Sequence, residues 1–273
     1  MYKYIVLDLD GTLLDRKKRI GQLSINEIKK CKTKGQHVII ASGRHYSDIK
    51  KYAEELGLDA SDWVICCDGQ YIYNGTGQKK MQKTSLKRED VDFIVSHYNI
   101  KAFALFSEEK DYYYSDSFID LLLRRLIVLA KRDGRTIICH TKKELPDNFE
   151  KMRVIQGDLP ALELDTNYTV HRVFGDKIDI TRKNVNKFSA LVTLFDTMNE
   201  SLNSIIYFGD DLNDIECFDN LKCCVAMGNA AEIIKEKAMY VTKSNVEDGV
   251  GVFLNMVSKE VEKRRNPTSL EEN

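Results

Sequence analysis

The sequence has almost no net charge and no concentrated block of basic residues. Its 41 Lys and Arg are balanced by 42 Asp and Glu, which gives a net charge of −1 at pH 7. Proteins that hold a nucleic-acid backbone or an anionic membrane surface usually present an excess of positive charge. We therefore expect no nucleic-acid partner and no membrane partner, and we interpret the partner as a small molecule.

A long apolar run is also missing. A membrane-spanning helix needs roughly 20 apolar residues in succession, and no stretch of this sequence approaches that length. The N-terminus enters a short apolar stretch at once and reaches an acid at Asp8. A signal peptide would have a longer apolar region and a cleavage site of small residues. These absences predict a cytoplasmic protein.

Paired cysteine motifs are absent as well. The seven cysteines follow no C-x-x-C or C-x-x-H spacing, which zinc sites usually show. Cys66 and Cys67 end one apolar run, and Cys223 and Cys224 begin another. Because free cysteine packs as a small hydrophobe, we interpret these residues as reduced structural thiols.

Both ends of the chain contain an alternation of short apolar runs and helical patterns. Before residue 84, the pattern predicts strands over 2–7, 37–41 and 63–67, helices over 24–34 and 46–56, and a hairpin over 71–83. Ser24 and Glu27 have the spacing of a capping box at the start of the first helix. From Lys187 onward the alternation returns, with helices predicted over 187–198, 212–218 and 249–263 and strands over 204–208, 222–226 and 239–241. Such alternation indicates a parallel sheet covered by helices on both faces.

The middle of the chain has a different pattern. It predicts strands over 112–114, 152–156, 169–174 and 177–181, a helix over 116–131 and a tight hairpin at Gly175-Asp176. We therefore predict an α/β protein with a doubly wound, Rossmann-like core formed by residues 1–83 and 183–273. Residues 84–182 are predicted to be an inserted α+β cap domain.

Two acids follow the first predicted strand directly, at Asp8 and Asp10. Side chains two residues apart on an extended segment point the same way, so both carboxylates can address one site. The carboxyl ends of parallel strands are where open α/β sheets bind ligands. Gly11 allows the sharp turn that leaves the acids exposed there. A solvated loop with two acids is the alternative interpretation of this segment alone.

Two further segments follow predicted strands. Ser42-Gly43-Arg44 comes just before a helix, and a hydroxyl with free backbone N–H groups at a helix start can bind an anion. The segment Gly209–Asp214 holds four oxygen-bearing side chains, which suit a hard cation such as Mg²⁺. Lys187 opens a helix shortly before that strand, where its ammonium could reach a bound phosphate.

In order and across the whole chain, these segments resemble the four motifs of the haloacid dehalogenase-like superfamily. The inserted domain and the segment Gly209–Asp214 resemble its Cof-type phosphatase branch, as do Ala226-Met-Gly-Asn-Ala230 and Asp248-Gly-Val250. Two positions differ from the usual pattern of the branch. Phe188 stands where relatives often have glycine, and Cys67-Asp68-Gly69 replaces a frequent Asn-Gly.

The resemblance implies a role for each acid. Asp8 would be the nucleophile and a magnesium ligand. Asp10 would offer its backbone carbonyl to the metal and its carboxyl group as general acid and base. Asp210 would complete the metal ligands, with Asp214 as a further ligand or a support. The phosphoryl group would be bound by Leu9, Ser42, Gly43, Lys187 and Asn213.

The function implied is that of a Mg²⁺-dependent phosphatase, which hydrolyses phosphate monoesters of small metabolites through an aspartyl phosphate. Sugar phosphates are the first expectation, and the protein would be a monomer or a weak homodimer. Two alternatives stay open: a phosphomutase of the phosphomannomutase type, and a non-catalytic protein that binds phosphorylated metabolites. Steady release of inorganic phosphate would distinguish the phosphatase from both.

Overall fold

The computed structural model describes residues 2–82, 85–131, 134–157, 167–173 and 177–265. The chain divides into two compact units, one formed by residues 1–82 and 186–273 and the other by residues 83–185. We call them the core unit and the inserted unit. Each has a hydrophobic core of its own.

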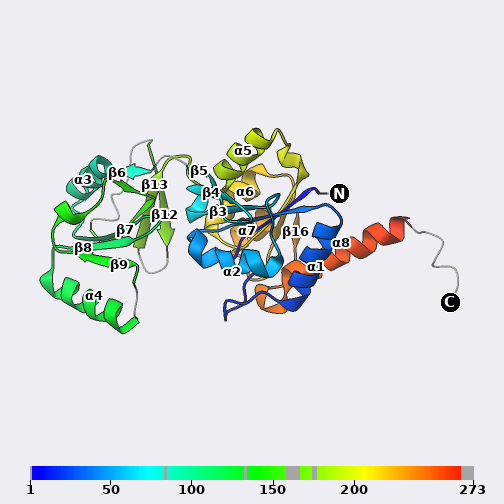
Figure 1. Cartoon of the computed structure of the whole chain (residues 1–273), viewed down its shortest axis with the longest axis horizontal. Coiled ribbons are helices and arrows are strands. Elements are labelled where there is room, and N and C mark those ends of the chain that lie inside the picture. The colour runs from blue at the N-terminus through cyan, green and yellow to red at the C-terminus, as the bar shows by residue number, and fades with distance from the viewer. Residues whose placement is uncertain (1, 83–84, 132–133, 158–166, 174–176, 266–273) are drawn as a thin grey trace. The chain divides into compact units, whose positions relative to one another are not determined.

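The core unit is built on an eight-stranded sheet in the order β16-β15-β14-β1-β2-β3-β4-β5 (Figure 1). The strands are β1 (Tyr4–Leu7), β2 (His37–Ala41), β3 (Trp63–Cys66), β4 (Tyr71–Asn74), β5 (Lys79–Gln82), β14 (Ile205–Gly209), β15 (Cys224–Ala226) and β16 (Tyr240–Val241). Neighbours from β16 to β3 are parallel, and β4 and β5 form an antiparallel edge. The chain order reverses between β1 and β14, so the topological switch point lies between these two strands.

Helices cover both faces of this sheet. They are α1 (Gln22–Thr33), α2 (Tyr46–Leu56), α5 (Lys187–Met198), α6 (Ile215–Asn220), α7 (Glu232–Lys237) and α8 (Gly249–Arg265). α1 contacts α2 and α8, whereas α6 contacts α5 and α7, which gives one helical layer on each face (Figure 1). The predicted doubly wound α/β core is therefore confirmed. Among the described residues, none of the helices is both long enough and apolar enough to span a bilayer.

The inserted unit contains a six-stranded sheet in the order β12-β13-β11-β7-β8-β9. Its strands are β7 (Ala102–Phe106), β8 (Asp111–Ser115), β9 (Thr136–Cys139), β11 (Lys151–Gln156), β12 (Tyr168–Val173) and β13 (Lys177–Arg182). β6 (Leu86–Lys87) and β10 (Asn148–Phe149) form a separate pair. The apolar residues of α3 (Arg88–His97) pack in a core with one face of the large sheet. α4 (Phe118–Lys131) contacts β8 and β9.

Several local predictions are confirmed, and one is wrong. α2 and α5 have the predicted bounds, and α2 ends where Gly57 takes a left-handed conformation. The predicted capping box of α1 is wrong, because the helix begins at Gln22 and Ser24 lies inside its first turn. None of the seven cysteines forms a disulfide, and five of them are buried. The predicted hairpin at Gly175-Asp176 lies outside the described residues.

Candidate active site

The residues singled out in the sequence gather at the switch point of the core sheet. Leu7 of β1 pairs with Phe208 of β14, so the two parallel strands end at the same edge. Asp8 continues from β1, and its backbone N–H donates to the carbonyl of Phe208 at 3.0 Å. Asp210 follows the end of β14. The carboxylates of Asp8 and Asp210, which are 202 positions apart in the chain, therefore lie close together.

Three acids form a cluster at this edge. Asp8, Asp210 and Asp214 each offer a carboxylate oxygen, and these oxygens lie within 4.8 Å of one another. Gly11 makes room for the cluster, because a Cβ at this position would lie 2.0 Å from Oδ2 of Asp210. Its φ of +89° also confirms the expected turn, which other residues adopt only with strain. The hydroxyl of Thr12 donates to Oδ1 of Asp210 at 2.8 Å.

Lys187 brings a buried ammonium into the cluster. Its Nζ donates to Oδ1 of Asp8 and to Oδ1 of Asp214, both at 2.6 Å. The residue is the first of α5, and Asn186 caps that helix by accepting from the backbone N–H of Ser189 at 2.7 Å. A lysine at a helix start is usually exposed, but this one is 1% exposed.

Asp214 is held by four donors. Besides Lys187, the hydroxyl of Tyr207 donates to its Oδ1 at 2.6 Å. Its Oδ2 accepts from the backbone N–H groups of Asp210 at 3.0 Å and Asp211 at 3.3 Å. Asp214 is fully buried. This carboxylate therefore fixes both the ammonium of Lys187 and the turn that carries Asp210.

The charges in the cluster do not balance, because three carboxylates face one ammonium. Burial, with help from the charges of Asp214 and Asp210, raises the pKa of Asp8 well above its usual range. Burial is also the main reason that the pKa of Asp210 rises to about 7. Burial opposes the charge on Lys187, yet Asp214 and Asp8 outweigh it and raise its pKa. An all-oxygen donor set with surplus negative charge fits a hard divalent cation.

Asp10 points into a different environment. Its carboxylate accepts from Nε of Arg44 at 2.5 Å and Nη2 at 2.6 Å, and it also pairs with Lys18. Tyr52 supports this arrangement, since its hydroxyl donates to the carbonyl of Lys18 at 3.0 Å. Partial burial opposes ionisation of Asp10, but the hydrogen bonds from Arg44 and Lys18 outweigh it and lower the pKa. The structure thus gives the two carboxylates different partners, Lys187 for Asp8 and Arg44 with Lys18 for Asp10.

The predicted anion site follows β2. Ser42 is buried, and its Oγ accepts from the backbone N–H of Arg44 at 3.3 Å. Gly43 lies against Asp68, since a Cβ at Gly43 would be 2.9 Å from Oδ1 of that residue. Nδ2 of Asn213 donates to the same Oδ1 at 3.4 Å. The side chain of Leu9 is fully buried, so only its backbone could contact a phosphoryl group.

Asp68 is a site residue that the sequence did not single out for a role. Cys67, Asp68 and Gly69 have φ angles of 51°, 53° and 103°, three left-handed residues in succession. Non-glycine residues in this region are uncommon, and strain of this kind clusters at functional sites. The available signal was the position of Asp68 after β3, at the same edge of the sheet as Asp8 and Ser42.

Comparison with known proteins identifies the family. Residues 5–254 match the model of the haloacid dehalogenase-like hydrolases, so the chain belongs to that family. Pyridoxal phosphate phosphatase YbhA of Escherichia coli is 25% identical over 267 residues, which cover 92% of this chain and 97% of that protein. The 5-amino-6-(5-phospho-D-ribitylamino)uracil phosphatase YitU of Bacillus subtilis is 27% identical, with 92% and 95% covered.

Solved structures agree on the fold. A haloacid dehalogenase-like hydrolase from Bacteroides thetaiotaomicron superposes with a TM-score of 0.75 at 23% identity, covering 94% of this chain and all of that one. A Bacillus subtilis member of the same class gives 0.74, also at 23% identity, with 93% and 99% covered. The predicted family, fold class and enzyme class are confirmed: the chain is a hydrolase, and its phosphatase-named relatives support a phosphoric monoester hydrolase.

Proposed function

We propose that the protein is a Mg²⁺-dependent phosphatase that transfers the phosphoryl group of a small metabolite to Asp8 and then to water. The observation that carries this proposal is the contact of Asp8 with a fully buried lysine inside a carboxylate cluster. A carboxylate nucleophile must approach an anionic phosphate, so it needs fixed positive charge beside it. Lys187 supplies part of that charge.

The first step forms a bond from a carboxylate oxygen of Asp8 to phosphorus and breaks the bond from phosphorus to the ester oxygen. Asp10, which is ion-paired as a carboxylate in the structure and must first take up a proton, gives that proton to the leaving oxygen. In the second step Asp10 takes a proton from water, the water oxygen attacks phosphorus, and the carboxylate of Asp8 is released with inorganic phosphate. Proton transfer of this kind contributes about 10²- to 10⁴-fold in rate. Splitting the reaction in two replaces one difficult step by two easier ones.

Five groups would hold the phosphoryl oxygens in this proposal: the ammonium of Lys187, the hydroxyl of Ser42, the amide of Asn213, and the backbone at Leu9 and Gly43. A bound Mg²⁺, held by Asp8, Asp210 and the backbone carbonyl of Asp10, would reduce the repulsion between the carboxylate and the phosphate. Asp214 would act mainly by fixing Lys187, because four donors already contact its two oxygens.

Sugar phosphates are the first candidates for the substrate. The names of two relatives add pyridoxal phosphate and a ribitylaminouracil phosphate to the compounds worth testing. A panel of such esters, assayed for inorganic phosphate, should show turnover with several members. Isomerised sugar phosphate without release of inorganic phosphate would instead indicate a mutase.

Trapping of the phosphoenzyme tests the mechanism most directly. The Asp8→Asn variant should show no turnover and no mass gain, because an amide is a poor nucleophile. The Asp10→Asn variant should accumulate a phosphoryl group on Asp8 when it is given an acyl phosphate. That leaving group hardly needs a proton, whereas the later attack of water still needs a base.

An alkyl phosphate provides the internal comparison, since its poor leaving group needs a proton from Asp10. It should therefore label the Asp10→Asn variant far more slowly than the acyl phosphate does. Equal labelling of both variants, or a label on a residue other than Asp8, would show that the proposed mechanism is wrong.

A further inference from the structure

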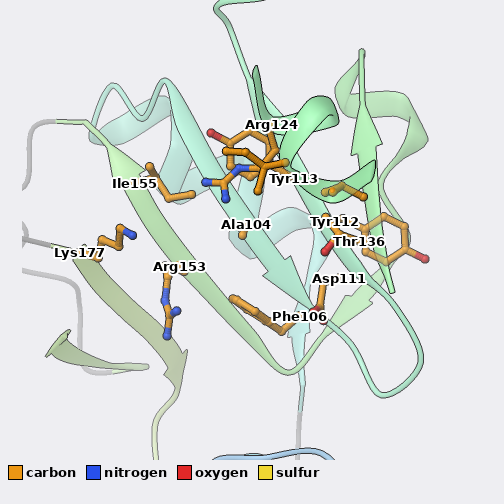
Figure 2. A pocket seen from close by; sticks show the side chains of 12 residues that line it. Ala104, Phe106, Asp111, Tyr112, Tyr113, Arg124, Thr136, Arg153, Ile155 and Lys177 are labelled. Atoms are coloured by element: carbon orange, nitrogen blue, oxygen red, sulfur yellow. The ribbon is translucent and has the colours of Figure 1, made fainter. Parts of the chain in front are cut away.

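A hollow of about 190 Å³ lies within the inserted unit, on the sheet face opposite its apolar core (Figure 2). Alternate residues of a strand point to opposite faces of a sheet. Phe103 and Leu105 of β7 belong to the apolar core, so Ala104 and Phe106 point to the other face. α4 borders the hollow on one side through Arg124, Ile127 and Val128.

A small residue at the centre of the sheet creates this hollow. Ala104 pairs with Arg153 of β11 on one side and with Tyr113 of β8 on the other. Because alanine carries only a methyl group, the surface of the sheet is recessed at Ala104, between the much larger side chains of Arg153 and Tyr113. Phe106 and Ile155 add apolar surface around it. The hollow therefore combines an apolar floor and walls with space for a flat group.

Two cations at the hollow have no carboxylate partner among the described residues. They are Arg124, whose guanidinium lies 4.3 Å from the ring centroid of Tyr113, and Lys177 at the start of β13. Arg153 differs, because it donates two hydrogen bonds to Asp179 at 2.6 and 2.7 Å. The charge of Arg153 is thus balanced. The carboxylate of Asp111, which also lines the hollow, lies 3.7 Å from Nη2 of Arg135. Arg124 and Lys177 therefore give the hollow its surplus positive charge.

We propose that this hollow binds a small organic anion, made of one flat ring with a carboxylate or another compact anionic group. A cavity of roughly 150 Å³ holds one benzene molecule, so 190 Å³ leaves room for one ring and little more. The ring would lie on Ala104 among the apolar walls, and the anionic group would meet Arg124 and Lys177. Binding here depends neither on Mg²⁺ nor on the acids of the core unit, so it does not depend on the proposed phosphatase activity.

Three probe molecules test the ring and the anionic group of this ligand separately. Binding to the full chain would be measured by ligand-observed NMR and calorimetry with benzoate, benzamide and acetate. Benzoate should bind at least about tenfold more tightly than benzamide, which has the ring without the charge. Acetate, which has the charge without the ring, should also bind more weakly. If benzamide equals benzoate, or if benzoate shows no saturable binding, the proposal is wrong.

Matched variants locate the binding. Arg124→Met and Lys177→Met keep the long apolar stem and remove the charge, and each should weaken benzoate binding about tenfold. Arg125→Met is the control, because Arg125 is the next residue of α4 but is exposed and does not line the hollow. Equal loss in Arg125→Met and Arg124→Met would place the anion elsewhere. Ala104→Leu should abolish binding by filling the floor, provided that circular dichroism shows an unchanged fold.

Enzyme kinetics then identify the source of the anion. Inhibition of p-nitrophenyl phosphate hydrolysis by benzoate would be measured in the parent chain and in Lys177→Met. Competitive inhibition that weakens in the variant would identify the anion as the organic part of a substrate. Inhibition or activation without competition would identify a separate effector. Competitive inhibition that is unchanged in the variant would assign benzoate to the core unit and contradict the proposal.

Discussion

Three carboxylates meet one buried ammonium at the edge of the core sheet, and this imbalance leads to a prediction about metal binding. Mg²⁺ should raise the melting temperature of the parent protein, because a ligand that binds only the folded state stabilises it. Asp210→Asn should lose most of that increase, since it removes a charge from the donor set. Thermal unfolding with and without MgCl₂ measures both effects.

Asp211→Asn is the control for this experiment. Asp211 is exposed, is not one of the three clustered acids, and its side chain accepts from the neighbouring backbone N–H of Leu212 at 2.8 Å. Its melting temperature should respond to Mg²⁺ as the parent does. Chelator should also abolish turnover, and full activity after verified metal removal would overturn the metal assignment.

Arg44 and Lys18 pair with the carboxylate of Asp10, and in the proposed mechanism this makes Arg44 a positioning residue. Arg44→Met should lower kcat for an alkyl phosphate about 10- to 100-fold, since small misplacements of a catalytic group are costly. Labelling of Asp8 by an acyl phosphate should be nearly unchanged, because that step does not require Asp10. Arg16→Met changes an exposed arginine on the loop that carries Lys18, and it should leave both rates unchanged. Equal loss with both substrates would mean that Arg44 acts on the phosphoryl group itself.

At the residue scale, the sequence predicted which side chains meet but not how they are held. The positions of Asp8, Asp210 and Lys187 follow from strand ends and a helix start, which are local signals. The orientation of Asp10 depends on Arg44, 34 positions away, and on a loop that brings Lys18 close. Contacts of this kind depend on tertiary packing and leave no periodic pattern in the sequence.

At the scale of the elements, the start of α1 is fixed by a residue far away in the sequence and not by its own local capping pattern. Asp248 caps this helix from the other end of the chain, because its Oδ2 accepts from the backbone N–H of Leu23 at 2.8 Å. The hydroxyl of Ser24 also bonds Asp248 and accepts from the N–H of Gly251 at 2.9 Å. The spacing of Ser24 and Glu27 therefore suggested a cap that the structure does not use. The bounds of α2 and α5 were predicted correctly because the residues that begin and end these helices are their immediate neighbours in the sequence.

This tie between α1 and α8 predicts a measurable stability. Asp248→Ala should lower the free energy of unfolding by about 1–3 kcal/mol, because buried donors in the first turn of α1 lose their acceptor. Asp248→Asn should cost less, since asparagine keeps an oxygen acceptor and tolerates the φ of 61° found there. Urea unfolding measures both. Asp219→Ala removes only an exposed pair with Lys237 and should change stability by less than about 1 kcal/mol. A similar loss in Asp219→Ala and Asp248→Ala would contradict the capping argument.

At the scale of the whole molecule, alternation of strands and helices predicted the core sheet, whereas the inserted unit was predicted only in part. Its strands β6, β7, β9 and β10 and its helix α3 were missed. β7 alternates a buried face of Phe103 and Leu105 with Ala104 and Phe106, so its short sequence is apolar throughout and lacks a clear period. A short apolar run of this kind is compatible with a strand or a buried helix.

The separate cores of the two units lead to a prediction about specificity. We propose that the inserted unit selects the substrate, while the core unit carries the chemistry. Replacing residues 84–182 by a short linker should leave a core unit that folds, because its hydrophobic cluster draws only on residues of that unit. Circular dichroism and binding of vanadate would check the fold and the phosphoryl site.

The shortened protein should then lose selectivity among large esters. Its kcat/KM values for a small substrate such as acetyl phosphate and for several sugar and heterocyclic phosphates should become similar. The parent should rank the same compounds over a wider range, because a second domain can contribute binding energy that depends on the organic part of the substrate. Vanadate binding separates loss of selectivity from loss of the site. A shortened protein that binds vanadate and keeps the parent's ranking would assign specificity to the core unit instead.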